Sequence, residues 1–283
     1  MNRLRTFLIL GRVSNLPTVW SNCLAGWWLG GGGNFKSLPF LLAGATFLYV
    51  GGMFLNDAFD AEFDTRHRQE RPIPSGMIEP DLVWRWGLAF LALGVVSLLW
   101  PGKVTGGLGV ALAFCVILYD AVHKLIAFSP VLMGVCRFFL YVLAASTGVN
   151  GVSGWCIWGG LALAAYVVGL SYVARRESTR DPLHYWPLFF LAAPVVLAMI
   201  IDVNGYREGA LLLSAVLGLW VLRCLRHTLW SAERDLGRTV SGLLAGIVFV
   251  DWLAVADAPN NAAIVFVFLF GLALLLQRIV PAT

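Results

Sequence analysis

Ten long apolar stretches dominate this sequence and decide what it can fold into. Most of them run nearly unbroken for roughly 17 to 20 residues, the length that an α-helix needs to cross the hydrocarbon of a membrane. Only helices and closed barrels satisfy the backbone in lipid, and a barrel would need short strands of alternating polarity. The stretches are Leu16–Leu29, Leu38–Leu55, Val83–Trp100, Gly106–Val122, Val131–Gly148, Trp155–Val173, Trp186–Ile201, Ala210–Leu225, Val240–Ala256 and Ala262–Leu276. We therefore expect an all-α polytopic membrane protein.

Composition supports this expectation. Only 13% of the 283 residues are charged and 59% are hydrophobic, whereas soluble domains carry about 25% charged residues. Such a chain cannot cover a water-facing surface. No segment between the apolar stretches is long enough to fold alone, so we expect one domain, residues 1–283.

The basic residues predict the orientation of the chain. If the N-terminus lies in the cytoplasm, sixteen of the twenty Lys and Arg residues fall on that side. Lys36, Lys103 and Arg207 fall on the other side, and Arg137 lies within an apolar stretch. This bias predicts a cytoplasmic N-terminus in an integral membrane protein, for which a bacterial inner or plasma membrane is the expected location. The net charge of +4 then reflects topology, and no motif for nucleic-acid binding accompanies it.

Cysteine and histidine give no sign of a metal site. The five Cys lie within apolar stretches without paired spacing, so we expect structural thiols. The four His, which are His67, His123, His184 and His227, all fall on the cytoplasmic side and are not spaced as ligands. We expect them to be solvated loop residues.

An acidic segment follows the second apolar stretch without a break. Asn56, Asp60 and Asp64 are spaced four apart and would share one face of a helix, with Asp57 beside them. Like charges stacked at a membrane boundary are unfavourable without a counter-ion. Carboxylate oxygens suit Mg²⁺, which keeps waters and is completed by substrate phosphates. The pattern favours a site for a diphosphate over the alternative, a solvated acidic loop.

Four motifs resemble the UbiA superfamily of intramembrane prenyltransferases. The most specific is Asn56-Asp57-x-x-Asp60-x-x-x-Asp64 with its tail, residues 71–76 (Arg-Pro-Ile-Pro-Ser-Gly), which is similar to that family's first aspartate-rich motif. Residues 12–18 (Arg-Val-Ser-Asn-Leu-Pro-Thr) resemble its entry into the first helix. Tyr119-Asp120-x-x-x-Lys124 and Gly134-x-x-Arg137 resemble later motifs, and all four lie in the expected order.

The resemblance implies a bundle of nine helices, ten by hydropathy here, around a central cavity. It implies Mg²⁺-dependent transfer of an isoprenyl group from its diphosphate to a hydrophobic or aromatic acceptor through an allylic cation, among membrane lipids. The implied metal ligands are Asn56, Asp60 and Asp64, with Asp57 as a further candidate. Arg71, Lys124 and Arg12 would bind the diphosphate. Further substrate-binding residues would be Asn15, Tyr119, Asp120 and Arg137. Of these, Tyr119 and Asp120 would line the acceptor side or order Lys124. The expected catalytic residues are Asp60, Asp64, Lys124 and Tyr119. Arg137 has the alternative of neutralising Asp120 or a helix end.

The chain departs from the family at its second aspartate-rich motif, usually DxxxD. The sequence there is Ser171-Tyr172-Val173-Ala174-Arg175-Arg176-Glu177, continuing to Asp181. Glu177 and Asp181 keep the four-residue spacing and would replace the missing metal ligands. Alternatively, Arg175 and Arg176 bind the diphosphate directly, with Tyr172 beside the substrate. Loss of this second metal site is also compatible with an altered substrate, weak activity or a retired active site.

Three functions therefore stay open. The first is prenyl transfer, with an aromatic acceptor as the leading candidate. The second is a membrane terpene cyclase, and the third is a non-catalytic protein that binds or transports an isoprenoid or lipid on the same fold.

Asp251 interrupts the ninth apolar stretch, which predicts either a re-entrant or peripheral helix or a residue that faces a polar bundle interior.

Overall fold

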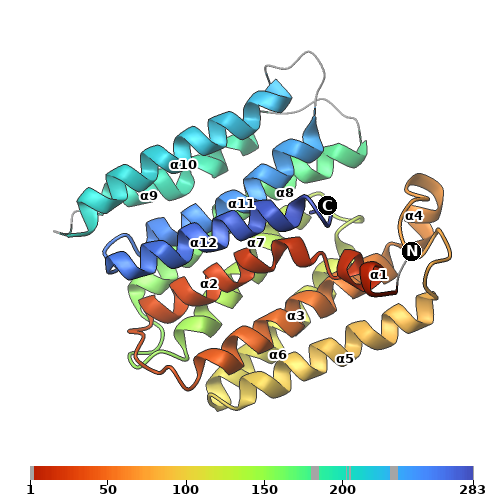
Figure 1. Cartoon of the computed structure of the whole chain (residues 1–283), viewed down its shortest axis with the longest axis horizontal. Helices are drawn as coiled ribbons and strands as arrows, with labels where there is room; N and C mark the ends of the chain where they lie inside the picture. Colours follow the sequence, from red (N-terminus) through yellow and green to blue (C-terminus); the bar gives the residue numbers. More distant parts are fainter. Residues whose placement is uncertain (1–2, 180–184, 202, 204, 230–234, 283) are drawn as a thin grey trace.

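The computed structural model describes residues 3–179, 185–201, 203, 205–229 and 235–282, and the described part forms helices and no strand. The helices run side by side as a bundle (Figure 1). In chain order the α-helices are α1 (Arg3–Leu10), α2 (Leu16–Leu29), α3 (Leu38–Phe59), α4 (Ala61–His67), α5 (Pro80–Leu99), α6 (Lys103–Val122), α7 (Ser129–Ala145), α8 (Gly154–Thr179), α9 (Ala193–Ile200), α10 (Tyr206–Leu229), α11 (Leu236–Ala254) and α12 (Asn260–Gln277). Two 3₁₀ segments, η1 (Val13–Asn15) and η2 (Trp186–Ala192), precede α2 and α9.

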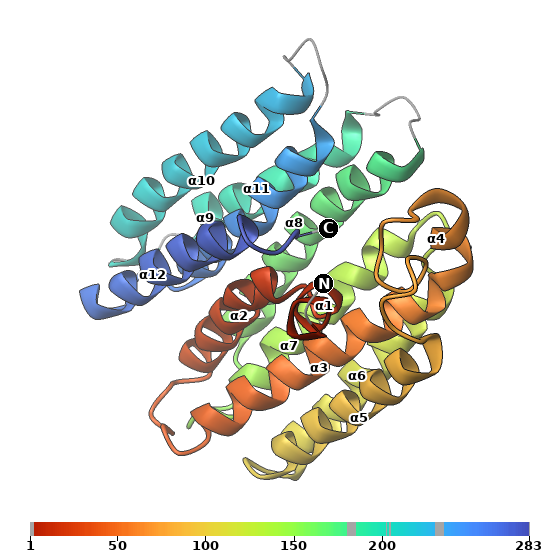
Figure 2. The same ribbon diagram turned by 45° about the vertical axis from the view of Figure 1, so that its right-hand side comes forward.

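All ten apolar stretches are helical, which confirms the predicted all-α membrane fold. Within the described ranges, six helices are long and apolar enough to cross a membrane, namely α3, α5, α6, α8, α10 and α11. Shorter apolar helices are α7, the η2–α9 pair and α12. The start of α1 and the segment after α12 lie toward the same end of the bundle as α4 (Figures 1 and 2).

Two details differ from expectation. The seventh stretch is not one regular helix: it begins as η2 and continues as α9. Pro194 lies in the first turn of α9 and has no N–H to donate to the preceding turn, which accounts for the change of helix type. The ninth stretch is one continuous helix, α11, in which Asp251 is completely buried. A re-entrant helix at Asp251 is therefore wrong, and a residue that faces the bundle interior is correct.

Glycines allow α3 and α5 to approach closely. A Cβ atom on Gly51 of α3 would lie 2.9 Å from the backbone oxygen of Gly87 on α5. About two helical turns away along both helices, a Cβ atom on Gly94 would lie 3.0 Å from the backbone oxygen of Gly44. Small residues facing each other bring membrane helices into backbone contact. This packing holds the C-terminal end of α3, which carries the acidic motif, beside the start of α5.

Candidate active site

The acidic motif forms a row of side chains at the end of α3, called the acidic ladder below, which consists of Asn56, Asp60 and Asp64. The Asp60 N–H donates to the Asn56 carbonyl at 3.0 Å, and the Asp64 N–H donates to the Asp60 carbonyl at 2.8 Å. Asp60 lies between α3 and α4 in helical conformation, so the i→i+4 hydrogen bonds continue across the break between the two helices. Asn56, Asp60 and Asp64 therefore share one face, as the spacing predicted, and all three line one cavity.

Asp57 has a different environment from the other three. Its Oδ1 atom accepts from Arg12 and from Arg71, at 3.1 Å each. It does not line the cavity, and neither does Arg12. Burial lowers the pKa of Arg12, but the charges of Asp57, Tyr49, Tyr119 and Asp60 together outweigh burial and raise that pKa above its ordinary value. Asp57, a further candidate for a metal ligand by sequence, thus lies outside the cavity and pairs with arginines that also contact Asn56 and Asp64.

Arg71 links this pair to the ladder. Its Nη1 atom also donates to Oδ2 of Asp64 at 2.9 Å. Burial raises the pKa of Asp64, opposed by the charge of Arg71, and burial lowers the pKa of Arg71. The turn after Arg71 explains the tail of the motif: the Ser75 N–H and hydroxyl both donate to the Arg71 carbonyl, at 3.0 and 2.7 Å. Gly76 follows with φ +72°, a left-handed conformation that glycine adopts without strain.

Two residues that follow α6 hold Asp60. Nζ of Lys124 lies 2.7 Å from Asp60 Oδ1, and Nε2 of His123 lies 3.3 Å from the same atom. Burial alone would raise the pKa of Asp60, but the hydrogen bonds and charges of His123 and Lys124 together outweigh burial and lower it. The prediction of a solvated loop histidine is wrong for His123, which lines the cavity. Its position four residues after Tyr119, within a family motif, was the available sequence signal; in the structure the two rings stack with their centres 5.1 Å apart.

Tyr119 and Asp120 take separate places. Tyr119 lines the cavity, whereas Asp120 is buried behind it and accepts from Asn56 Nδ2 at 3.0 Å. Asp120 therefore orients a ladder residue. Within the described part of the chain, Arg137 does not pair with Asp120; it donates instead to Asn22 Oδ1 at 2.6 Å.

The cavity has a volume of about 460 Å³ and two kinds of wall. Its polar end carries the ladder, Lys124, His123 and the arginines Arg68 and Arg71. Its inner wall is mainly apolar and includes Met133, Val167, Leu170, Leu244 and Ile247. Asn15 and Arg137 add polar groups beside that wall, and Asn15 donates through Nδ2 to the backbone oxygen of Ala282 at 2.9 Å. Arg68 is a site residue that sequence reasoning left unassigned.

The divergent second motif also reaches the cavity in part. Ser171 and Arg175 line it, and Arg175 Nη1 donates to the carbonyls of Ile126 and Ala127, at 2.7 and 3.1 Å. Arg175 thus anchors the loop between α6 and α7. Tyr172 does not line the cavity; its ring lies 6.4 Å from that of Trp186. Asp181 lies outside the described residues, as do the side chains of Arg176 and Glu177.

The oxygen atoms of the acidic ladder suit a Mg²⁺ ion that is coordinated jointly by the protein and a substrate diphosphate. No three Asp, Glu, His or Cys side chains of the described ranges come together as a metal-binding group. Mg²⁺, however, is usually held by only one or two carboxylates together with water and substrate phosphates. Oδ1 of Asp64 is buried without a hydrogen-bond partner, and Asp60 lines the same cavity. Asp60 and Asp64 therefore fit a Mg²⁺ ion that a diphosphate completes, and Asn56 adds a third oxygen, Oδ1, which also accepts from Arg12 Nη2 at 3.2 Å.

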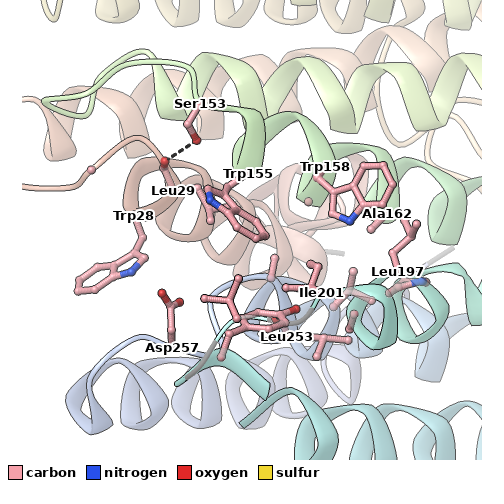
Figure 3. Close-up of a pocket in the computed structure, with 18 of the residues that line it drawn as sticks. Trp28, Leu29, Ser153, Trp155, Trp158, Ala162, Leu197, Ile201, Leu253 and Asp257 are labelled. Carbon is pink, nitrogen blue, oxygen red and sulfur yellow. Dashed lines mark hydrogen bonds between the residues drawn. The ribbon is translucent and has the colours of Figure 1, made fainter. Parts of the chain in front are cut away.

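A second cavity of about 360 Å³ lies at the opposite end of the bundle. Figure 3 shows its wall, in which Trp28, Trp155 and Trp158 are prominent and Asp257 lies near Trp28. No lysine or arginine is among its described lining residues. It offers no counter-charge to a diphosphate, so the first cavity is the candidate active site.

Comparison with known proteins identifies relatives of this chain. The model of the UbiA prenyltransferase family matches residues 16–280. Proteins named digeranylgeranylglyceryl phosphate synthase are similar over part of the chain. The one from Ignicoccus hospitalis is 38% identical over 104 residues (37% of this chain, 34% of that protein), and the one from Sulfolobus acidocaldarius is 30% identical over 122 residues (43% and 44%). The matched segments thus span less than half the length of these relatives.

Solved structures show the same fold. The apo structure of a UbiA homologue from Aeropyrum pernix superimposes with a TM-score of 0.66 at 16% identity, over 88% of this chain and 98% of that one. A UbiA homologue from Archaeoglobus fulgidus bound to GPP and Mg²⁺ has a TM-score of 0.57 at 14% identity, over 95% and 98%. Because the family match begins at the first residue of α2 and extends beyond the end of α12, this chain belongs to the UbiA prenyltransferase family.

Proposed function

We propose that this chain transfers an isoprenyl group from its diphosphate to a membrane-associated acceptor. The observation that carries the proposal is the two-sided cavity, in which acidic and basic groups meet at one end and an apolar wall continues from them. An isoprenyl diphosphate has the same division between a charged head and an apolar tail. Among the described residues, the second cavity has no such division, because its lining contains no basic side chain.

The polar end suits the diphosphate. Lys124, Arg68 and Arg71 supply positive charge to its oxygens, and charge-assisted hydrogen bonds of this kind are the strong ones. Asn56, Asp60 and Asp64 would hold Mg²⁺, which stabilises the charge of the departing diphosphate when it is bound. Asp57, paired with Arg12 and Arg71, sets the position of Arg71.

The apolar wall suits the reaction that follows. As the bond between C1 of the isoprenyl group and the diphosphate oxygen breaks, an allylic cation forms and pyrophosphate leaves. Met133, Val167, Leu170 and Leu244 keep water away from that cation. A nucleophilic atom of the acceptor then bonds to C1 and loses its proton.

The acceptor is the finer part of this proposal. The relatives' names state a product built on glyceryl phosphate, which supports an acceptor of glycerophosphate type ahead of an aromatic one. Their matched segments cover less than half of each relative, so both acceptor classes enter the test. The same charge bias that predicts the topology supports an active site on the cytoplasmic face.

Pyrophosphate release tests the activity. Purified protein receives Mg²⁺ and isoprenyl diphosphates of several chain lengths, with a glyceryl phosphate lipid, with an aromatic acceptor, or with no acceptor. We expect release that depends on one acceptor class and is abolished in Asp60→Asn. Release without any acceptor, with a cyclic product, would replace transfer by cyclisation. No release at any chain length from protein with an intact melting transition would leave a non-catalytic isoprenoid-binding protein.

A further inference from the structure

Two opposite charges lie within the bundle, away from the acidic ladder. Arg137 on α7 is 9% exposed and lines the cavity. Asp251 on α11 is completely buried and follows Ile247, another lining residue, by one helical turn. Ionisable residues inside a membrane bundle are costly and normally have partners. Nothing in the transfer reaction described above uses Asp251.

Asn22 of α2 joins the two charges. Its Oδ1 atom accepts from Arg137 Nη1 at 2.6 Å, and its Nδ2 atom donates to Asp251 Oδ2 at 2.7 Å. The amide is thus oriented by a cation on one side and a carboxylate on the other. Because an amide has distinct donor and acceptor ends, a negative charge at Asp251 keeps the acceptor end of Asn22 toward Arg137.

The surroundings leave the guanidinium little other support. Arg137 makes two longer contacts, with the carbonyl and the hydroxyl of Thr18, at 3.4 and 3.3 Å. Asp251 is also held by the Ser21 hydroxyl, which does not contact Arg137. Three helices, α2, α7 and α11, therefore meet at this chain of contacts, and it ends on the cavity wall.

We infer that Asp251 is a positioning residue that acts through Asn22 to hold the Arg137 guanidinium against the inner wall of the cavity, toward an oxygen atom of the bound acceptor. The inference rests on the proposed function for the role of Arg137 at the substrate. The linkage between Asp251 and Arg137 is independent of that function.

A stability cycle tests the linkage without any activity. The variants are Arg137→Met, Asp251→Leu and the double variant, compared by melting temperature in detergent. Removing one partner leaves an uncompensated buried charge, whereas removing both leaves none. We expect the double variant to melt at or above the less stable single variant. A double variant whose loss equals the sum of the two single losses would overturn the linkage.

A kinetic cycle tests positioning. We expect Asp251→Asn to lower kcat/KM for the acceptor about tenfold, the size of one hydrogen bond to a charged group, with KM for the isoprenyl diphosphate unchanged. Added to Arg137→Gln, the same change should cause no further loss. Ser21→Ala is the matched control, since it removes a hydrogen bond to the same carboxylate off the path to Arg137; it should lower the melting temperature only. If the losses of kcat/KM in Asp251→Asn and Arg137→Gln add up in the double variant, the positioning role is overturned. If the wild-type protein is inactive, the proposed function is rejected, and the stability cycle still decides whether Asp251 and Arg137 are linked.

Discussion

Nζ of Lys124 lies 2.7 Å from Oδ1 of Asp60 and 3.6 Å from the centre of the Phe63 ring. These two contacts hold the ammonium group over the acidic ladder, where a diphosphate would meet it. We expect Lys124→Met to raise KM for the isoprenyl diphosphate by about tenfold or more, because it removes a charge-assisted hydrogen bond. Phe63→Leu keeps the ion pair and removes the contact of the ammonium with the ring, together with the stacking of that ring on His67; it should raise KM by roughly two- to fivefold. Steady-state kinetics measure both, and an unchanged KM in Lys124→Met would contradict the assignment.

Asp64 and Asp57 give a matched pair for the metal site. Asp64 has a buried oxygen without a partner, whereas Asp57 is engaged with two arginines. We expect Asp64→Asn to raise the Mg²⁺ concentration needed for half-maximal activity by about tenfold or more, since one of the few carboxylate ligands is lost. Asp57→Asn should lower the melting temperature and shift the Mg²⁺ dependence much less than Asp64→Asn does. A Mg²⁺ titration of pyrophosphate release decides, and equal shifts in both variants would contradict the separation of the two residues.

The part of the site that sequence predicted is the part that depends on local spacing. Asn56, Asp60 and Asp64 share a face because four residues make about one helical turn, a relationship that is fixed before the chain folds further. The ten apolar stretches are recognisable for the same reason, since length and polarity alone decide whether a helix spans lipid.

The rest depends on partners that are distant in the sequence. His123 has no ligand spacing of its own, and only the packing of α6 beside α3 places it at Asp60. Asp57 resembles the ladder residues by sequence, but it pairs with Arg12 and does not line the cavity. The sequence alone gives no reason for Asp251 within an apolar stretch. The structure gives one, because α2 places Ser21 and Asn22 within hydrogen-bond distance of its carboxylate. The break at Pro194, by contrast, was readable from the proline itself.

Packing of α3 on α5 should not tolerate a side chain at Gly51. A Cβ atom there would lie 2.9 Å from the Gly87 backbone oxygen, so Gly51→Val forces the helices apart. We expect a loss of about 1–3 kcal/mol in stability, typical of overpacking. Gly107 on α6 is the matched control, since nothing lies within 4 Å of its Cβ position, and Gly107→Val should change little. Melting temperatures in detergent compare the two, and equal losses would contradict the close contact.

The orientation in the membrane can be tested with two exposed loop positions. Asn34 lies at the end of the bundle with few basic residues, and Gln69 lies beside the acidic ladder; both are exposed. We expect a membrane-impermeant maleimide to label Asn34→Cys in intact cells and to label Gln69→Cys only after the membrane is opened. Four of the five native cysteines are buried and Cys115 is partly buried, so the unsubstituted protein gives the background. The charge bias across the bundle sets the expected direction. The reverse pattern would place the active site on the outer face and overturn the proposed orientation.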